Sequence, residues 1–392
     1  MRSRRLVNFG TALWALAAFS RFGWLSPFAW AGGPGSGISH VYVGTYSPKE
    51  GEGIFHATLD TRTGVLGPLR PAAGAKSPAA LAIGPGGKFL YATTIVPDEQ
   101  GKPTGGVAAY AIDGATGALR EIDSRRSGGT GPCYLSVDGE GKVLLVSHCG
   151  TANVACLPLR ADGRFGEAAT VIQHEGKSEN SEGKPQAHSI IVAPGNRFAI
   201  AGDLGLDRLF VYGLDAARGR MAPHQLPFAR VPTGAGPRHL AAHPSGRFIY
   251  SINELDNTVT ALRFFKESGK LEALQSLSAL PADFKGESYT ADIQAHPGGR
   301  LVFGSNRGHD SIAAFRVEPG TGRLQSIGQT PSGGKFPRSI AIHPSGGFLF
   351  VANQKSDRLS IFRIDSATGR LDSTGQEIPV PQPVSMRILT RP

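Results

Sequence analysis

The nine residues HPSGRFIYS, at positions 243–251, decide the fold because close copies of them recur along the chain. The copies read GPGGKFLYA (84–92), DGEGKVLLV (138–146), APGNRFAIA (193–201), HPGGRLVFG (296–304) and HPSGGFLFV (343–351). Each joins a tight turn to five or six strand-forming residues, and successive copies are 47 to 55 residues apart. An internal repeat of this length, made of strands and turns, predicts the blades of a β-propeller.

A second recurring turn, of the D-x-x-T-G-x-L kind, gives the number of blades. Its glycine stands at Gly64, Gly117, Gly163, Gly219, Gly269, Gly322 and Gly369. The segments between the two turns, such as RLFVYGL (208–214) and SIAAFRV (311–317), alternate with the period of two that half-buried strands show. We therefore expect an all-β chain that forms one seven-bladed β-propeller over residues 39–392, with about four short strands in each blade.

The two ends of this repeat region predict how the ring closes. The first repeat contains the strand HVYVGTY (40–46) but no innermost strand before it. The segment PVSMRI (383–388), near the carboxyl terminus, matches the start of the innermost strand at 237–240. We expect this C-terminal strand to complete the first blade.

The amino terminus has the features of a signal peptide over residues 1–31, followed by a Gly-rich linker at 32–38. Arg4 and Arg5 precede an uncharged apolar run at 6–20, and Ala29-Trp30-Ala31 offers the small residues of a cleavage site. The run is shorter than the roughly 20 residues that cross a bilayer. We expect export to the periplasm or secretion, by a signal that resembles the twin-arginine type at SRRLV (3–7), and no membrane contact after cleavage.

The net charge and the cysteine content limit the kinds of ligand and bound metal that the protein is expected to have. The formal net charge of +10 falls to about +6 without the leader, and no block of Lys and Arg marks a nucleic-acid surface. The surplus favours a small anionic ligand. The sequence has three cysteines, Cys133, Cys149 and Cys156, and none of them has CxxC spacing. We therefore expect neither a zinc site nor a disulfide framework. One disulfide bond beside a free thiol stays an open alternative. The oligomeric state is not predicted.

The motifs of several enzyme classes are missing from the sequence. It contains no GxSxG, HExxH or P-loop motif and no GxGxxG motif after a strand, which argues against serine hydrolases, zinc hydrolases and nucleotide enzymes. We expect no cofactor and no metal.

The repeat also separates residues that serve every blade from residues that serve chemistry. Types that recur at one repeat position are expected to be structural; these are His243, His296 and His343 before a proline, Asp207, Asp256, Asp310 and Asp357 at a tight turn, and Asn253, Asn306 and Asn353 as turn caps.

Two repeat positions vary and carry reactive side chains. The first follows the proline that opens each innermost strand, and its members are Ala79, Cys133, His188, Arg238, Ala291, Arg338 and Val384. The second follows the asparagine cap, where Glu254, Arg307 and Gln354 replace the apolar Ile95 and Leu204. Because innermost strands line the channel of a propeller, we expect these side chains to converge at one end of it.

This set predicts acid/base chemistry on an anionic substrate. His188 and Glu254 can move protons, and Arg238 and Arg307 can hold a carboxylate or phosphate by forked hydrogen bonds, so these four are the catalytic candidates. Arg338, His239, Asp292 and Gln354 are the candidates for substrate binding. The alternative is a channel filled by a His/Arg/Glu network without turnover.

Several short motifs together resemble those of the seven-bladed propeller lactonase family, which includes a 6-phosphogluconolactonase and the carboxymuconate lactonising enzymes. They are GTYS (44–47), AHSI (187–190), DLGLD (203–207), GPRH (236–239), Asn253-Glu254 and NRGHDS (306–311). Gln186 stands where the family often has a second histidine. The resemblance implies a lactonase acting on an anionic sugar lactone. With the leader and the His/Arg/Glu set, we expect an exported lactonase that needs no metal; the alternatives are a muconate-type lactonising enzyme and a non-catalytic exported propeller that binds a partner.

Overall fold

The structure, a computed structural model, describes residues 37–47, 49, 51–166, 170–178 and 183–390. The predicted signal peptide and residues 32–36 of the predicted linker lie outside the described residues. The first strand begins at Ile38, the last residue of that linker. Within the described ranges, no helix has both the length and the apolar character needed to cross a membrane.

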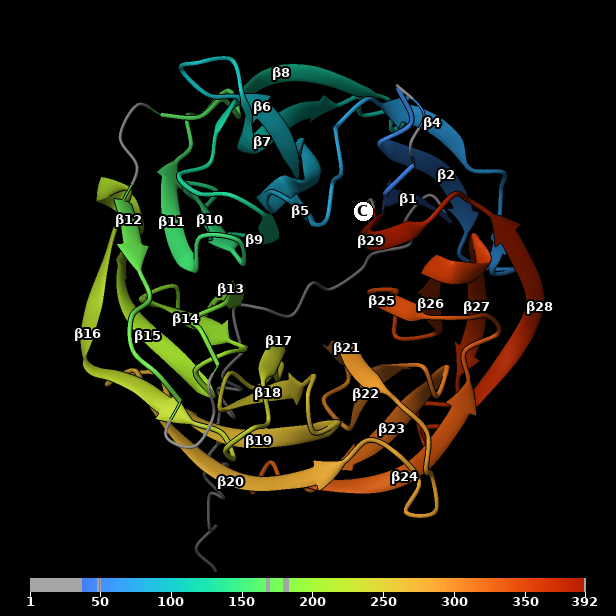
Figure 1. Ribbon diagram of the computed structural model, residues 1–392. Coiled ribbons are helices and arrows are strands. Elements are labelled where there is room, and N and C mark those ends of the chain that lie inside the picture. The colour runs from blue at the N-terminus through green and yellow to red at the C-terminus, as the bar shows by residue number, and fades with distance from the viewer. Residues whose placement is uncertain (1–36, 48, 50, 167–169, 179–182, 391–392) are drawn as a thin grey trace, which may run out of the picture.

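The described residues form seven antiparallel sheets arranged as blades around a central channel (Figure 1). The strands of each blade are given from the channel outward. Blade 1 contains β29 (Pro383–Thr390), β1 (Ile38–Thr45), β2 (Ile54–Asp60), β3 (Val65–Leu66) and β4 (Arg70–Ala73), and blade 2 contains β5 (Leu81–Ile83), β6 (Phe89–Pro97), β7 (Pro103–Ile112) and β8 (Leu119–Arg126). Blade 3 contains β9 (Pro132–Val137), β10 (Val143–His148), β11 (Asn153–Pro158) and β12 (Thr170–Gln173). Blades 4 and 5 are β13 (Ala187–Val192), β14 (Phe198–Asp203), β15 (Arg208–Asp215) and β16 (Arg220–Arg230); and β17 (Pro237–Ala242), β18 (Phe248–Asn253), β19 (Thr258–Phe265) and β20 (Lys270–Ser278). Blades 6 and 7 are β21 (Tyr289–Ala295), β22 (Leu301–Arg307), β23 (Ser311–Val317) and β24 (Leu324–Pro331); and β25 (Pro337–Ile342), β26 (Phe348–Asn353), β27 (Arg358–Ile364) and β28 (Leu371–Pro379). Three single 3₁₀ turns, Pro85–Gly87, Ala216–Arg218 and Gln354–Ser356, lie between strands.

The last strand completes the first blade, as the sequence predicts. β29 pairs antiparallel with β1, with Ile388 opposite Val41 and Met386 opposite Val43. Both the seven-bladed β-propeller and its closure by the C-terminal strand are therefore confirmed.

The hydrophobic core is divided among the interfaces between blades. Seven clusters of buried apolar residues each draw on two neighbouring blades, one cluster for every interface of the ring. Between blades 5 and 6, for example, Phe248 and Tyr250 of β18 belong to one cluster with Val302 and Phe315. Burying such a side chain stabilises the fold by about 1.5–3 kcal/mol, so blade packing holds the ring together and leaves the axis free for polar groups.

The recurring histidines and glycines join neighbouring blades. His243 Nε2 lies 2.7 Å from the carbonyl oxygen of Gly299, and His296 Nε2 lies 3.0 Å from that of Gly346, each in the next blade. The seven turn glycines all have φ between 64° and 84°, and a Cβ on Gly322 would come within 2.3 Å of the Phe248 ring. A side chain at this turn would thus be strained and would also clash, which explains why glycine recurs there.

Candidate active site

A β-bulge at the start of the innermost strands turns the candidate side chains into the channel. In β13, Ala187 pairs with Asp203 and Ser189 pairs with Gly202, so His188 has no partner in the ladder. The same irregularity isolates Arg238 in β17, Arg338 in β25 and Cys133 in β9. A bulge re-aims a side chain and is frequent beside active sites, and it explains why one repeat position collects reactive residues.

The recurring aspartates fix the loops that lead into these strands. Asp207 accepts hydrogen bonds of 2.9 Å from the backbone N–H groups of Gly234 and Gly236, just before β17. Asp310 accepts from Phe336 N at 2.7 Å, and Asp357 accepts from Gln382 N at 2.8 Å. Asp207, Asp310 and Asp357 therefore have the predicted structural role, since each anchors the entry of the next innermost strand, whereas Asp256 accepts from the backbone N–H and the hydroxyl of Thr258 within its own blade.

Glu254 binds two of the predicted arginines at once. Its Oε2 accepts from Arg238 Nη1, and its Oε1 lies 2.9 Å from Arg307 Nη2. Burial alone would raise the pKa of Glu254, but the charges of Arg238 and Arg307 outweigh burial and lower it. Arg307 also donates to the carbonyl oxygens of Tyr289 and Thr290, so this cluster is fixed in place.

His188 is buried beside this cluster with an unsatisfied ring nitrogen. Among the described residues, its Nδ1 has no hydrogen-bond partner, and neither has the Nε of Arg238. Burial, and after it the charges of Arg238 and His239, hold the pKa of His188 well below its ordinary value. The imidazole is therefore neutral at pH 7 and able to accept a proton.

His239 and Asp292 form a separate pair deeper in the channel. His239 Nδ1 lies 3.0 Å from Asp292 Oδ1, and the other carboxylate oxygen accepts from Ser339 Oγ at 2.9 Å and from Ile340 N at 3.0 Å. The pair joins blades 5, 6 and 7. The Oε1 of Gln354 is buried and has no hydrogen-bond partner in the part of the chain that the structure describes. A substrate-binding role for these three residues stays a prediction.

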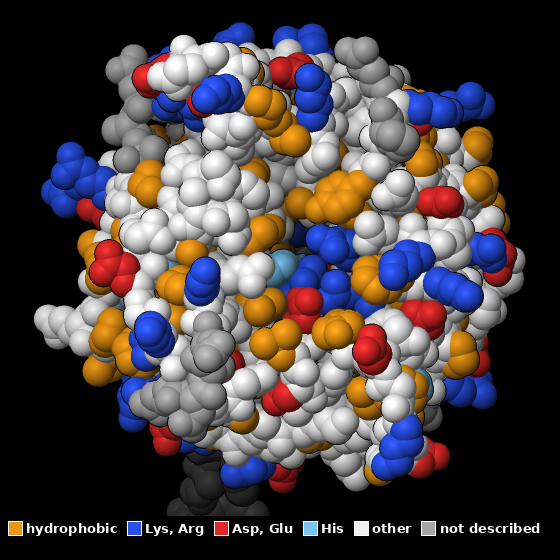
Figure 2. Space-filling view, viewed as in Figure 1, with side chains coloured by type: hydrophobic (Ala, Val, Ile, Leu, Met, Phe, Trp, Pro, Cys, Tyr) orange, Lys and Arg blue, Asp and Glu red, His pale blue; other side chains and the backbone are white. Residues whose placement is uncertain are grey.

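A cavity of about 320 Å³ opens beside His188 and Arg338. It is also lined by Tyr46, Cys133 and Cys149. Figure 2 shows Lys and Arg side chains gathered in the hollow at the centre of this face, with an acidic and a histidine side chain next to them. The structure thus divides the site into an Arg238–Glu254–Arg307 cluster and an adjacent cavity that contains Arg338.

Sequence reasoning missed two residues of this cavity, although the repeat contains the signal for them. Tyr46 and Cys149 directly follow β1 and β10, the position that Glu254 occupies after β18, while Arg307 is the last residue of β22. Cys149 was expected only as a possible disulfide partner. All three cysteines are free thiols in the structure. The pKa of Cys149 is lowered to about 7, first by the neighbouring Cys133 thiol, against the effect of burial and with help from Arg238.

Asp203 anchors the segment just before His188. Its carboxylate accepts from the backbone N–H groups of Gln186, Gly205 and Leu206 at 2.9 to 3.1 Å. Its second oxygen lies 2.6 Å from His174 Nδ1. This buried network replaces the asparagine cap of blades 5 to 7 and fixes how the chain enters β13.

No group of three or more His, Cys, Asp or Glu side chains within the described ranges is placed to hold a metal ion.

Comparisons with known proteins agree with this architecture. The family profile described as Lactonase, 7-bladed beta-propeller, matches residues 40–388. The 6-phosphogluconolactonase of Bacillus subtilis is 34% identical over 299 residues, which cover 76% of this chain and 83% of that protein. The 6-phosphogluconolactonase of Formosa agariphila is 32% identical over 307 residues, covering 76% and 85%. The solved periplasmic gluconolactonase of Pseudomonas aeruginosa has a TM-score of 0.82 and 30% identity, covering 91% of this chain and 100% of that one. The chain therefore belongs to the seven-bladed β-propeller lactonase family, and its enzyme class is that of the lactone-hydrolysing carboxylic ester hydrolases of the 6-phosphogluconolactonase type.

Proposed function

We propose that the protein is an exported lactonase that hydrolyses an anionic sugar lactone, such as 6-phosphogluconolactone, without a metal ion. The observation that carries the proposal is that His188 and Arg338 line one cavity beside the Arg238–Glu254–Arg307 cluster. Three guanidinium groups against one carboxylate leave a positive field that favours an anionic substrate. The leader-like residues 1–31 and the periplasmic gluconolactonase among the similar structures support export.

In this proposal His188 is the general base. Its neutral imidazole takes a proton from a water molecule, whose oxygen attacks the lactone carbonyl carbon. The ring C–O bond then breaks, and the proton returns to the leaving oxygen, so that the product is a hydroxy acid. A positioned base of this kind contributes about 10²- to 10⁴-fold in rate.

Arg338 stabilises the oxygen that becomes negative during the attack. It has no carboxylate within ion-pair distance among the described residues, whereas Arg238 and Arg307 both bind Glu254. Removing one such donor typically costs about 10²- to 10³-fold in kcat. Arg238 and Arg307 hold the anionic group of the substrate.

Glu254 serves as the anchor of the two arginines in this scheme. A carboxylate whose pKa is lowered by two guanidinium groups is a weak base. Both oxygens of Glu254 are engaged by Arg238 and Arg307, whereas the Nδ1 of His188 has no hydrogen-bond partner among the described residues. Of the two base candidates that the sequence leaves open, His188 is the one proposed for this reason.

The test is turnover by the purified chain without residues 1–31. Phosphorylated gluconolactone, plain gluconolactone and a carboxymuconate are compared with and without EDTA, and the spontaneous rate is subtracted. Chelator-resistant hydrolysis that prefers the phosphorylated lactone is the expected result. Faster hydrolysis of the plain lactone would correct the substrate, and loss of activity in EDTA would overturn metal independence.

Two further outcomes would favour the alternatives. Ring closure of the carboxymuconate with no lactone hydrolysis would indicate a lactonising enzyme. No turnover of any compound by a folded protein would indicate a propeller that binds a partner. The variant His188→Asn, checked for folding by circular dichroism, is the control for all three substrates.

A further inference from the structure

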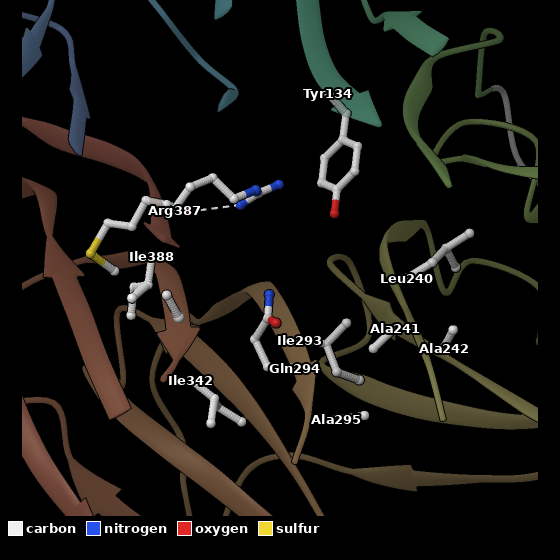
Figure 3. Close-up of a pocket in the computed structure, with 12 residues that line it drawn as sticks. Tyr134, Leu240, Ala241, Ala242, Ile293, Gln294, Ala295, Ile342, Arg387 and Ile388 are labelled. Carbon is white, nitrogen blue, oxygen red and sulfur yellow. Dashed lines mark hydrogen bonds between the residues drawn. The ribbon is translucent and has the colours of Figure 1, made fainter. Parts of the chain in front are cut away.

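A second cavity, of about 350 Å³, lies at the other end of the channel (Figure 3). The later residues of the innermost strands line it, including 240–242 of β17, 341–342 of β25 and 386–388 of β29. Arg338 stands at the start of β25, four residues before Ile342. Four strand residues span about 13 Å. The two cavities share no lining residue and are separate sites, although Tyr134 of this one directly follows Cys133 of the other.

Three polar side chains from three different blades meet at this cavity. Figure 3 shows the Arg387 guanidinium and the Tyr134 hydroxyl directed toward each other across the opening, with the Gln294 amide also pointing into it. They come from β29, β9 and β21. Ile342 and Ile388 line the cavity with aliphatic surface.

Arg387 is the one charged side chain that lines the cavity within the described part of the chain. Its Nη1 donates to the carbonyl oxygen of Met386 at 2.7 Å, and among the described residues no carboxylate lies within ion-pair distance of it. Arg238 and Arg307, by contrast, each form an ion pair with Glu254. A half-buried guanidinium without a counter-ion in a concave wall is suited to a carboxylate, because its planar donors match the two carboxylate oxygens.

A carboxylate whose charge acts on Tyr134 is already engaged. Asp292, whose charge acts on Tyr134, binds His239, Ser339 and the backbone of Ile340. The positive charge of Arg387 therefore remains available to a ligand.

We infer that this cavity binds a small monocarboxylate with a short aliphatic body. One carboxylate balances the single charge of Arg387, accepts hydrogen bonds from the Tyr134 hydroxyl and the Gln294 amide N–H, and leaves its carbon chain against Ile342 and Ile388. The site lies away from the proposed catalytic cavity, so the inference is independent of the proposed lactonase activity.

Ligand-observed NMR with butyrate as the probe tests the inference on the full purified chain. Butyrate is expected to bind saturably at millimolar concentration, while the neutral butyramide does not. Arg387→Gln should weaken butyrate binding at least about tenfold, and Tyr134→Phe by a few-fold. Arg338→Gln, a matched change in the other cavity, should leave butyrate binding unchanged.

The opposite results would overturn the inference. They are no saturable binding at tens of millimolar, equal binding of butyramide, unaltered binding in Arg387→Gln, or loss of binding in Arg338→Gln, which would place the probe in the catalytic cavity. Thermal unfolding monitored by circular dichroism checks that each variant folds. If Arg387→Gln does not fold, Ile342→Asp replaces it, since an internal carboxylate opposite Arg387 should displace butyrate.

Discussion

The guanidinium of Arg338 lies over the ring of Tyr46, with its central carbon 5.4 Å from the ring centre and Nη2 3.4 Å from the hydroxyl. The contact crosses the seam where the last blade meets the first. An aromatic face attracts a cation without neutralising it, so Tyr46 holds Arg338 over the cavity while its charge stays available.

Arg338→Gln is expected to lower kcat/KM for lactone hydrolysis by about 10²- to 10³-fold, because the variant loses the donor for the developing oxyanion. Steady-state kinetics with an unchanged circular dichroism spectrum checks this. Tyr46→Phe is the matched control and should cost only a few-fold, since the ring remains. Equal losses of kcat/KM in both variants would contradict the assignment of oxyanion stabilisation to Arg338 and of a supporting contact to Tyr46.

Glu254→Gln should destabilise the fold by about 3–5 kcal/mol, because it leaves Arg238 and Arg307 buried without a counter-charge. The pKa of Glu254 is lowered in the folded state, so its contribution is present above the ordinary pKa of a glutamate and is lost as the pH falls through the lowered value. Urea unfolding between neutral and acidic pH should show this slope in the wild type and a flatter one in the variant. The same slope in both proteins would refute the assignment.

The pH dependence of hydrolysis reports on His188. Because burial and Arg238 hold its pKa well below 6.5, kcat/KM should stay level as the pH falls through 6.5 and decline only in more acidic solution. In Arg238→Gln the acidic limb should move to higher pH, since a charge that disfavours the imidazolium is removed. A limb near pH 6.5 in the wild type would argue against His188 as the base.

Cys149 should be the reactive thiol of the protein. Its pKa of about 7 makes alkylation by iodoacetamide accelerate as the pH rises through 7, whereas burial raises the pKa of Cys156 to about 12 and that of Cys133 well above its usual range. Peptide mass spectrometry identifies the labelled site. Cys149→Ser should abolish fast labelling. Fast labelling of Cys156 would contradict the burial of that thiol and its raised pKa.

Asp203→Ala should cost about 3–5 kcal/mol in stability, because three backbone N–H groups and His174 lose their common acceptor in a buried site. Denaturant unfolding gives the loss. Asp256→Ala, at an exposed turn, is the comparison and should cost under about 1 kcal/mol. A similar loss of stability in both variants would show that the network around Asp203 contributes no more to stability than an exposed turn does.

The number of blades could be read from the sequence because each blade needs the same turn chemistry. The positive φ at Gly64 and at its six counterparts admits few other residues, so the repeat stays visible where other positions vary. The closing strand was predictable for the same reason, since the segment at 383–388 follows the pattern of an innermost strand.

The sequence could predict which residues gather at the candidate site, but much less of how these residues contact one another. His188, Arg238 and Arg338 share one repeat position, but the β-bulge that turns them inward leaves no mark in the sequence. Nor could spacing show that Glu254 would bind both Arg238 and Arg307, because side-chain distances between blades depend on how the blades tilt and pack. Tyr46 and Cys149 escaped notice although they share a repeat position with Glu254.

The pairing of β29 with β1 also constrains how the chain folds as it is made. Until the last strand has been synthesised, the first blade lacks its channel-facing strand, and β1 keeps an unpaired edge. Blades 2 to 7 can form as neighbours in order, but the seam between the last and the first blade waits for Pro383–Thr390. Because Tyr46 and Arg338 stand on either side of that seam, the cavity next to His188 takes its final form only when the ring closes.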